Sequence, residues 1–167
     1  SNDARYLAVS LSIAGTDWRT IKVRDLKKGK NLPDKIEWVK FSNICWTDSG
    51  FFYSKFKDPP AGLTHIAANS QQQLCFHKLG DSTANDGVVY SIPDKANTFF
   101  HFDVTSDNQY LILYTAAKLN GEWCSVVAYQ DLEEGIYGGM NLFLASSFKD
   151  EISYNVIDHL NGKFLVQ

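Results

Sequence analysis

Short runs of apolar and β-branched residues recur along the whole chain, and polar turns separate them. The runs are rich in Val, Ile, Thr, Tyr and Phe, which are residues that favour strands. No stretch places its apolar residues at the 3.6-residue spacing of a convincing helix. The pattern therefore predicts an all-β protein. The expected strands are Arg5–Ser12, Thr20–Asp25, Ile36–Lys40, Ser42–Trp46, Phe51–Phe56, Leu74–Leu79, Val88–Ile92, Phe100–Val104, Tyr110–Thr115, Cys124–Tyr129, Leu142–Ser146, Tyr154–Ile157 and Lys163–Gln167.

A polar turn that contains Asp or Asn, followed by an aromatic residue and an apolar strand, occurs four times. The copies read SNDARYL, TDSGFF, SDNQYL and NGKFL, and Asp, Asn, Ser and Gly are residues that tight turns favour. Their aromatic residues, Tyr6, Phe52, Tyr110 and Phe164, are 46, 58 and 54 residues apart. A repeat of about 50 residues that consists of short strands is typical of the four-stranded blades of a β-propeller.

This repeat divides the chain into pieces of a propeller. It predicts a partial β-propeller of four-stranded antiparallel blades, with two complete blades and two incomplete ones. The expected pieces are a partial blade at residues 1–40, a blade at 41–92, a blade at 98–146 and a partial blade at 152–167. Because both ends fall inside a blade and leave strand edges unpaired, the chain is expected to be part of a longer protein. Its free edges are expected to pair with another copy or with a neighbour.

The composition is that of a soluble globular protein, with 44% hydrophobic and 21% charged residues. A net charge of −3 does not favour a nucleic acid partner. The basic stretch Lys22–Lys30 is explained by a solvated strand and turn, with a binding patch as the alternative. No apolar run approaches the roughly 18 residues needed to cross a bilayer, so no membrane partner is expected. The three cysteines, Cys45, Cys75 and Cys124, lie far apart in apolar runs, which predicts buried thiols in a reducing compartment, the cytoplasm.

No motif for catalysis, metal binding or cofactor binding is recognisable in the sequence. A serine hydrolase of the α/β type needs a nucleophile elbow, G-x-S-x-G, and none occurs; Gly138-Gly139 is followed by Met140. P-loop and G-x-G-x-x-G motifs do not occur either, and no His or Cys pair has the spacing of metal ligands. The prediction is therefore no catalytic residue, no metal site and no cofactor.

Residue types that often perform chemistry have simpler explanations in this chain. The four histidines are expected to be structural or on the surface: His65, His77, His101 and His159. Four aspartates in predicted turns are expected to cap those turns rather than to act as acids or bases: Asp17, Asp34, Asp48 and Asp107. The tryptophans are expected in the core between blades, with a stacking surface for sugars or bases as the alternative: Trp18, Trp38, Trp46 and Trp123.

Several pieces between Gly15 and Phe56 have an order and spacing too particular to come from composition. They are Thr16-Asp17-Trp18, Leu32-Pro33-Asp34, Trp38-Val39-Lys40-Phe41-Ser42, and Cys45-Trp46-Thr47 running into Gly50-Phe51-Phe52-Tyr53-Ser54. Together they resemble part of the β-propeller domain of prolyl oligopeptidase. The resemblance is also clear over Gln73–Val104 and Ser106–Thr115, and it weakens after Ala117, which indicates a divergent member.

The resemblance implies a seven-bladed propeller that caps an α/β-hydrolase domain in a cytosolic serine peptidase, which cuts short peptides after proline. This chain would supply a little under half of that cap and none of the catalytic residues. Its implied task is to gate access of the substrate. The implied partners are the α/β-hydrolase catalytic domain of the same parent chain and short proline-containing peptides.

One site residue is implied by the family position. The segment Tyr90-Ser91-Ile92-Pro93-Asp94 places Ile92 where the family commonly has an aromatic residue that helps to line the substrate's S3 subsite. Isoleucine would keep an apolar wall but lose ring stacking. The alternative is a buried residue at the end of a strand.

Two other functions remain open from the sequence. One is a propeller that serves as a non-enzymatic interaction scaffold, which explains the repeats but not the resemblance. The other is the propeller of a related peptidase, such as oligopeptidase B or a dipeptidyl peptidase IV-like enzyme. A downstream G-x-S-x-G followed by Asp and His would indicate a peptidase, whereas further blades alone would indicate a scaffold.

Overall fold

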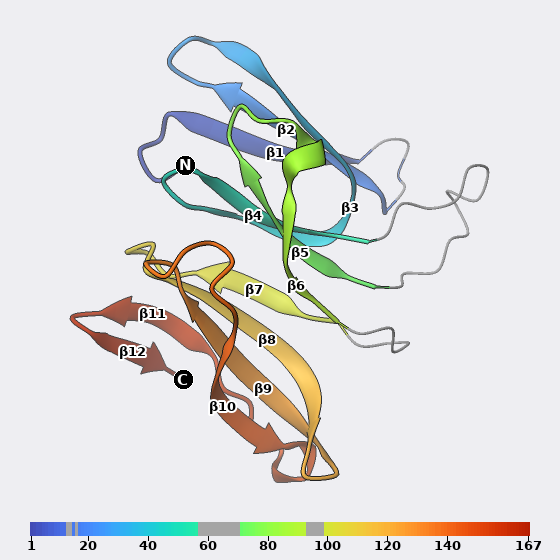
Figure 1. Ribbon diagram of the computed structural model, residues 1–167, viewed down its shortest axis with the longest axis vertical. Coiled ribbons are helices and arrows are strands. Elements are labelled where there is room, and N and C mark those ends of the chain that lie inside the picture. The colour runs from blue at the N-terminus through green and yellow to red at the C-terminus, as the bar shows by residue number, and fades with distance from the viewer. Residues whose placement is uncertain (13–14, 16, 57–70, 93–98) are drawn as a thin grey trace. The chain divides into compact units, whose positions relative to one another are not determined.

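The computed structural model describes residues 1–12, 15, 17–56, 71–92 and 99–167 (Figure 1). Among the described residues, 61% lie in strands and 4% in helix, so the fold is all-β, as predicted. Every strand pairing is antiparallel. The strands are β1 (Tyr6–Ser12), β2 (Arg19–Asp25), β3 (Lys30–Trp46), β4 (Gly50–Lys55), β5 (Gln73–Lys78), β6 (Gly87–Ser91), β7 (His101–Val104), β8 (Tyr110–Leu119), β9 (Glu122–Asp131), β10 (Asn141–Ser147), β11 (Val156–Leu160) and β12 (Lys163–Val166).

Two short 3-10 helices were not expected from the sequence. They are η1 (Thr83–Asn85), which begins at a serine whose side chain accepts a backbone hydrogen bond, and η2 (Phe148–Asp150), which begins in the same way. The strand expected at Tyr154–Ile157 is also displaced, because β11 pairs with β12 across the tight Asn161-Gly162 turn and so runs on to Leu160. Pro59, Pro60, Gly62 and the polar residues around them predict a long loop at Lys57–Gln71. Apart from Gln71, this segment lies outside the described residues.

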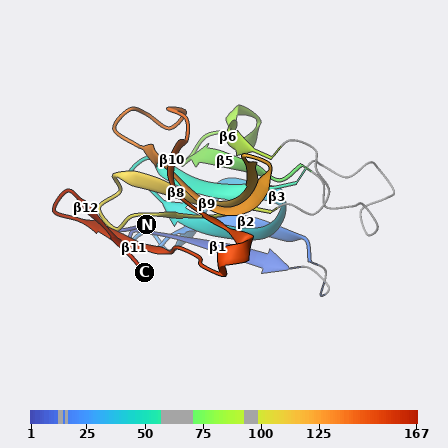
Figure 2. The ribbon, with the colours of Figure 1, turned by 90° about the horizontal axis from the view of Figure 1, so that it is seen from below.

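The chain divides into two compact units, residues 1–96 and 97–167. In the first unit, β1 to β6 form one sheet in sequence order. Figure 2 shows β1 and β2 on one side of β3, and β5 and β6 on the other. Side chains from β2 and β3 pack against side chains from β4 and β5, so the two halves of the sheet share one core. This core consists of Ile21, Val23, Ile36, Val39, Phe51, Tyr53 and Cys75.

The separate strands expected at Ile36–Lys40 and Ser42–Trp46 are a single strand, so that prediction was wrong. Val39 pairs with Arg19 of β2 and also with Lys55 of β4, and the register shifts on both sides of it. The backbone changes direction there because Trp38 and Phe41 have φ angles of 60° and 51°. Apolar periodicity does not reveal such a bend, because bulky aromatic residues rarely adopt positive φ.

In the second unit, a four-stranded sheet has the order β10-β9-β8-β7, and β11 and β12 form a separate hairpin. Ile112, Val127 and Val156 form the centre of the core between them. The hydroxyl of Tyr114 donates to the carbonyl of Val156 and accepts from its N–H, both at 3.1 Å, which holds the hairpin against the sheet.

The predicted repeat of the polar turn is present in the backbone geometry. In the turn before β1 and the turn before β8, one Asp oxygen accepts from a hydroxyl at 2.6 Å and from a backbone N–H at 3.1 Å. The same hydroxyl accepts from the N–H of the aromatic residue that begins the strand, at 2.9 and 3.0 Å. The equivalent residues are Ser1 and Thr105, Asp3 and Asp107, Arg5 and Gln109, and Tyr6 and Tyr110.

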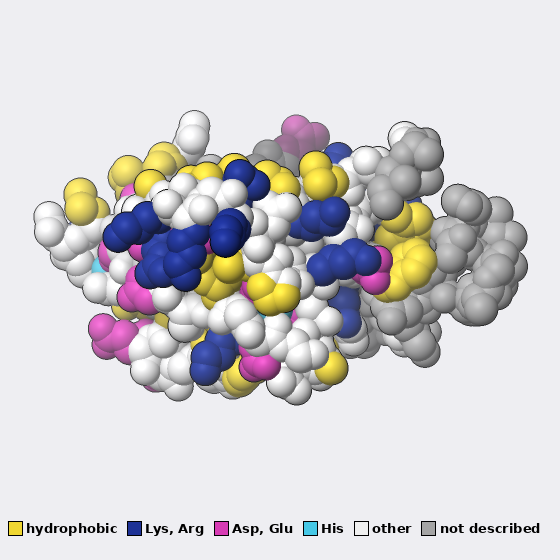
Figure 3. Space-filling view, turned by 90° about the horizontal axis from the view of Figure 1, so that it is seen from above, with side chains coloured by type: hydrophobic (Ala, Val, Ile, Leu, Met, Phe, Trp, Pro, Cys, Tyr) yellow, Lys and Arg dark blue, Asp and Glu magenta, His cyan; other side chains and the backbone are white. Residues whose placement is uncertain are grey.

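The basic stretch is a solvated strand and turn, as predicted. Lys22, Arg24, Lys27, Lys28 and Lys30 are all exposed. Figure 3 shows Lys and Arg side chains gathered over one face of the molecule. Among the described residues, no helix is long and apolar enough to cross a membrane.

Candidate functional site

The residue implied by the family position, Ile92, lies directly after β6 and is only 8% exposed. Its backbone N–H donates to the carbonyl oxygen of Gln72 at 3.3 Å. The Gln72 amide donates to the hydroxyl of Ser54 at 3.2 Å, and the N–H of Ser54 donates to Ser42 Oγ at 2.7 Å. This end of the sheet is therefore held by a buried polar chain. Pro93 and Asp94, which complete the family segment, lie outside the described residues.

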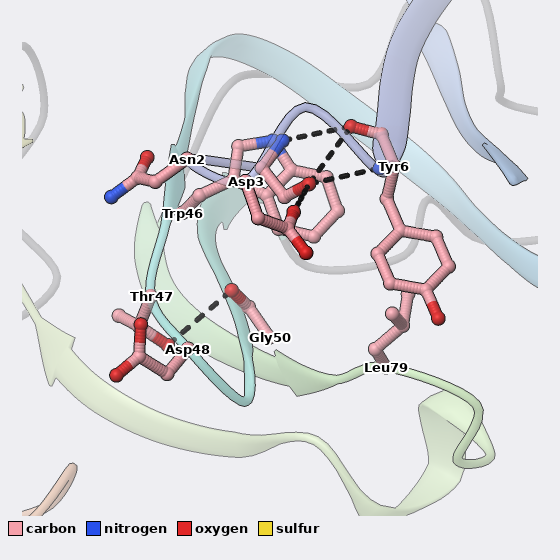
Figure 4. A pocket seen from close by; sticks show the side chains of 9 residues that line it. Asn2, Asp3, Tyr6, Trp46, Thr47, Asp48, Gly50 and Leu79 are labelled. Atoms are coloured by element: carbon pink, nitrogen blue, oxygen red, sulfur yellow. Dashed lines mark hydrogen bonds between the residues drawn. The ribbon is translucent and has the colours of Figure 1, made fainter. Parts of the chain in front are cut away.

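A pocket lies at the opposite end of the same sheet (Figure 4). Its volume is about 150 Å³. The pocket is formed by the turn before β1, the β3–β4 turn and the residue after β5, so three segments distant in sequence meet there. Its lining residues are Ser1, Asn2, Asp3, Tyr6, Trp46, Thr47, Asp48, Gly50 and Leu79.

Aromatic rings form one wall of the pocket, and acidic turns form its rim. The rings of Tyr6 and Trp46 are nearly parallel, with centroids 6.5 Å apart and an interplanar angle of 17°. Trp46 also contacts Phe51 edge to face at 5.0 Å, which fixes its ring against the core. Asp3 and Asp48 are both exposed. The Arg5 guanidinium lies over the Tyr6 ring, 4.9 Å from its centroid. The lining residues contain no pair of nucleophile and base.

A buried histidine two residues before Leu79 connects the strands on both sides of β4. His77 on β5 contacts Asp86 through Nδ1 at 2.8 Å and Asp34 on β3 through Nε2 at 3.0 Å. Asp86 also accepts from the Tyr53 hydroxyl at 2.8 Å, and Asp34 accepts from the N–H of Gly80 at 2.6 Å. The side chains of His77 and Asp34 are completely buried.

This network shifts the pKa values of its members. Burial opposes the charged form of His77, but hydrogen bonds and charge from Asp86 and Asp34 outweigh it, so the pKa of His77 is raised. Burial, followed by the charges of Cys75 and Asp86, raises the pKa of Tyr53. Burial also raises the pKa of the Cys75 thiol to about 11. A histidine that is held charged and a thiol that is held neutral are suited to stability rather than to catalysis.

The second unit contains a comparable contact at its own turn. Nδ1 of His159 donates to Oδ2 of Asp107 at 2.6 Å, and the histidine ring packs edge to face on Tyr110 at 4.7 Å. A hydrogen bond from Ser106 Oγ to Asp158 at 2.6 Å ties the same turn to β11. His159 therefore joins the turn before β8 to the hairpin of β11 and β12.

The structure agrees with some of the predicted roles of individual residues and corrects others. His77 and His159 are structural, as expected, whereas His65 lies outside the described residues. Asp107 caps its turn, as predicted, but Asp34 does not: it lies inside β3 and binds His77. Trp123 is 43% exposed in this chain rather than buried.

Nothing in the sequence pointed to the His77 network. Asp34 and Asp86 are separated from His77 by 43 and 9 residues. The pairing of β3, β4 and β5 brings Asp34 to His77, and the pairing of β5 with β6 brings Asp86. Among the described residues, no group of three His, Cys, Asp or Glu side chains could hold a metal ion.

The class of the protein follows from these observations. The sheets are antiparallel and do not close, the polar turns repeat, and the fold is that of a partial β-propeller. A family model described as "Prolyl oligopeptidase, N-terminal beta-propeller domain" matches residues 1–167. The chain belongs to the prolyl oligopeptidase family and forms part of its N-terminal propeller domain.

Curated relatives support this assignment. The chain is 33% identical over 132 residues to prolyl oligopeptidase A of Galerina marginata, which covers 68% of this chain and 18% of the relative. It is 33% identical over 116 residues to the prolyl endopeptidase of Elizabethkingia meningoseptica, covering 69% of this chain and 16% of that protein. The chain therefore spans less than a fifth of the length of these relatives.

Solved structures share the fold. Prolyl oligopeptidase B from Galerina marginata in its apo form matches with a TM-score of 0.74 and 23% identity, covering 98% of this chain and 24% of that one. The same enzyme bound to a 35mer hydrolysis and macrocyclization substrate matches with a TM-score of 0.75 and 24% identity, with the same coverage.

Proposed function

We propose that this chain is the non-catalytic propeller part of a prolyl oligopeptidase-type serine endopeptidase that cleaves short peptides after proline. The observation that carries the proposal is the match of the propeller family model to the whole chain. The named relatives are prolyl oligopeptidases and prolyl endopeptidases, which favours proline specificity over that of oligopeptidase B or dipeptidyl peptidase IV.

In this proposal the propeller caps the α/β-hydrolase domain of its own parent chain and gates access to it. A cap of this kind excludes folded proteins and restricts water around the reacting groups. Gating of this kind needs a cap whose sheets keep their shape. The cores of the two units and the buried His77 network support that requirement.

Two further parts of the proposal concern the surroundings of the protein. We assign it to the cytoplasm, and the three buried cysteines, none of them in a disulfide, support a reducing compartment. Short proline-containing peptides are the proposed ligands of the whole enzyme.

Pairing of exposed strand edges with a second copy stays a prediction. Light scattering of the chain at high concentration tests it, since a clean monomer would contradict it.

Cleavage of a fluorogenic Gly-Pro substrate tests the peptidase proposal. We expect the full-length protein to cleave it and residues 1–167 alone to be inactive. Inactivity of a folded full-length protein would instead favour the non-enzymatic scaffold.

Gating has its own measurement. The same cleavable sequence is presented to the full-length protein as a short peptide and within the loop of a folded carrier. We expect efficient cleavage of the free peptide only. Equal cleavage of both would contradict gating while leaving the peptidase activity intact.

The proposed role of Ile92 is to provide an apolar wall for the bound peptide. In the full-length enzyme, Ile92→Ala should raise KM by about ten-fold with little change in kcat, since lost apolar contact reduces ground-state and transition-state binding alike. Val88→Ala, at an exposed position on β6, serves as the control. An unchanged KM in the Ile92 variant would leave this residue with the role of a buried strand end.

A further inference from the structure

The segment from β2 to the first part of β3 displays charge of a single sign on its surface. Residues 19–35 contain seven basic and two acidic residues. All seven basic residues are exposed, whereas the acidic residues Asp25 and Asp34 are only 1% and 5% exposed. Figure 3 shows how such side chains gather on one face. The exposed basic residues are Arg19, Lys22, Arg24, Lys27, Lys28, Lys30 and Lys35.

Both acidic residues of this segment are used inside the fold. Asp34 contacts Nε2 of His77 at 3.0 Å. Oδ1 of Asp25 accepts from the backbone N–H of Lys28 at 2.8 Å, so this carboxylate caps the β2–β3 turn from its buried side. Neither carboxylate lies on the surface beside the lysine ammonium groups.

Four lysines at and beside the β2–β3 turn are available to a partner. They are Lys22, Lys27, Lys28 and Lys30, and none of them forms an ion pair with another residue in the described part of the chain. Lys35 differs, because its ammonium group lies 2.8 Å from Glu37, and both of these side chains are about half exposed.

The placement of these charges is unfavourable for the chain alone. Lys22 of β2 and Lys35 of β3 are direct cross-strand partners, and like charges in such a pair lower stability. The remainder of the chain shows no such excess, since it has nine basic and seventeen acidic residues. An anionic partner would relieve the repulsion that this concentration of positive charge creates.

Arg24 holds the turn that carries the lysines. Its Nη1 donates to Oδ1 of Asn31 at 3.0 Å, and its Nη2 donates to the carbonyl oxygen of Gly29 at 2.7 Å. Gly29 has a φ of 64°, which glycine adopts without the strain that a side chain would bring. The backbone of the turn is therefore ordered before a partner binds, which reduces the entropic cost of binding.

The surroundings of the lysines favour an acidic protein segment over other polyanions. Residues 19–35 include no aromatic residue on which unpaired bases could stack. The acidic remainder of the chain would repel an extended polyanion or an anionic membrane. A short segment rich in Asp and Glu can contact the turn without approaching that remainder.

We propose that the β2–β3 turn binds an acidic segment of a partner protein, whose carboxylates pair with Lys27, Lys28 and Lys30. Lys22 and Lys35 extend this surface along the two strands. A solvated strand and turn suits the role, because surface charges steer an oppositely charged partner before contact is made. The binding site goes beyond the peptidase function and uses none of the residues assigned to it.

Calorimetry of the full-length protein with the peptide acetyl-Glu-Glu-Gly-Glu-Glu-Gly-Glu-Glu-amide at low salt tests the proposal. The same peptide with glutamine in place of glutamate is the ligand control. We expect the glutamate peptide to bind at least about ten-fold more tightly, and its affinity to fall as salt is added. Equal affinities, or no binding of the glutamate peptide, would overturn the proposal.

Two triple variants locate the binding. Replacement of Lys27, Lys28 and Lys30 by glutamine should weaken binding of the glutamate peptide about ten-fold. Replacement of three exposed lysines elsewhere should leave the affinity nearly unchanged, although it removes the same net charge. These control positions are Lys78, Lys118 and Lys163. Equal losses in the two variants would show an effect of net charge alone and would exclude this turn as the site.

Two further measurements complete the test. Cleavage of the fluorogenic Gly-Pro substrate should be the same in the turn variant and the wild type, and the thermal midpoint shows that each variant is folded. A failure of the peptidase proposal would therefore leave the binding result intact. Tighter binding of an eight-nucleotide DNA strand or of phosphatidylserine vesicles than of the glutamate peptide would overturn the assignment to an acidic protein segment.

Discussion

At the scale of single residues, His77 shows how a polar group is kept inside an apolar core. A buried charge is costly unless hydrogen bonds and opposite charges compensate for it. Here two carboxylates contact the two ring nitrogens, and one of them is held in turn by the Tyr53 hydroxyl. The second oxygen of Asp34 is buried without a partner among the described residues, which adds negative potential beside the imidazole. His77 therefore stabilises the fold in its protonated form.

The raised pKa of His77 predicts a pH dependence of stability. Its contribution should be complete below the ordinary histidine pKa of about 6.5 and should be lost as the pH rises through the raised pKa of the folded state. The urea midpoint, followed by tryptophan fluorescence, should fall as the pH increases from 6 towards 9. The direction would be contradicted by a midpoint that rises over this range.

Removal of the same side chain should be strongly destabilising. His77→Ala leaves two buried carboxylates without their donor, which is expected to cost about 3–5 kcal/mol in the free energy of unfolding. The midpoint of this variant should also lose most of its dependence on pH. His101→Ala, at an exposed position on β7, is the matched control and should have little effect.

At the scale of elements, close approach of β4 and β5 depends on Gly50. A Cβ atom at this position would lie 2.0 Å from the backbone oxygen of His77. The oxygen belongs to a paired strand and cannot move independently of it. The carbonyl oxygen of Gly50 accepts a hydrogen bond from the N–H of Thr47, as the carbonyl oxygen of Tyr110 accepts one from the N–H of Thr105. Gly50 therefore holds the turn position that Tyr6 and Tyr110 hold in the other repeats. The aromatic residue at this repeat, Phe52, therefore lies two positions further along the strand.

Gly50→Ala is expected to destabilise the first unit by about 3 kcal/mol or more, because the methyl group forces two backbones apart. Thermal unfolding followed by circular dichroism measures the effect. Ser49→Ala, in the adjacent exposed turn, is the control and should lie within about 0.5 kcal/mol of the wild type. A Gly50 variant as stable as this control would show that the two strands can separate without cost.

At the scale of the whole molecule, each of the two units has its own core, and all three cysteines are buried and form no disulfide. Thiolate is the reactive form of cysteine, so a thiol that is both buried and neutral reacts slowly. Cys75 combines complete burial with a pKa of about 11. The three thiols should therefore be protected as long as the chain is folded.

Alkylation with iodoacetamide tests this protection. At pH 8, peptide mass spectrometry should find Cys45, Cys75 and Cys124 unmodified in the folded protein and fully modified in concentrated urea. Cys75 should be the slowest to react as urea is increased, since it lies within the core of the first unit. Rapid labelling of Cys75 without urea would mean that this core opens readily.

The sequence by itself determined the class of fold. Alternating apolar runs, polar turns with Asp and Gly, and a repeat of about 50 residues depend on local backbone preference and on side-chain spacing, which are readable along the chain. Most strand positions and the shared geometry of the turns at Asp3 and Asp107 followed from those signals, but the bend in β3 and the bounds of β11 did not. The family resemblance followed from ordered segments around Trp38 and Trp46.

Only the tertiary structure decided which distant residues meet. The bend in β3 depends on positive φ angles at Trp38 and Phe41, which no propensity favours. The contacts of His77 with Asp34 and Asp86, and the pocket beside Asp3 and Trp46, arise because sheet pairing and face-to-face packing join segments tens of residues apart. Spacing along a chain fixes local geometry, whereas contacts between strands depend on how the whole sheet folds over its core.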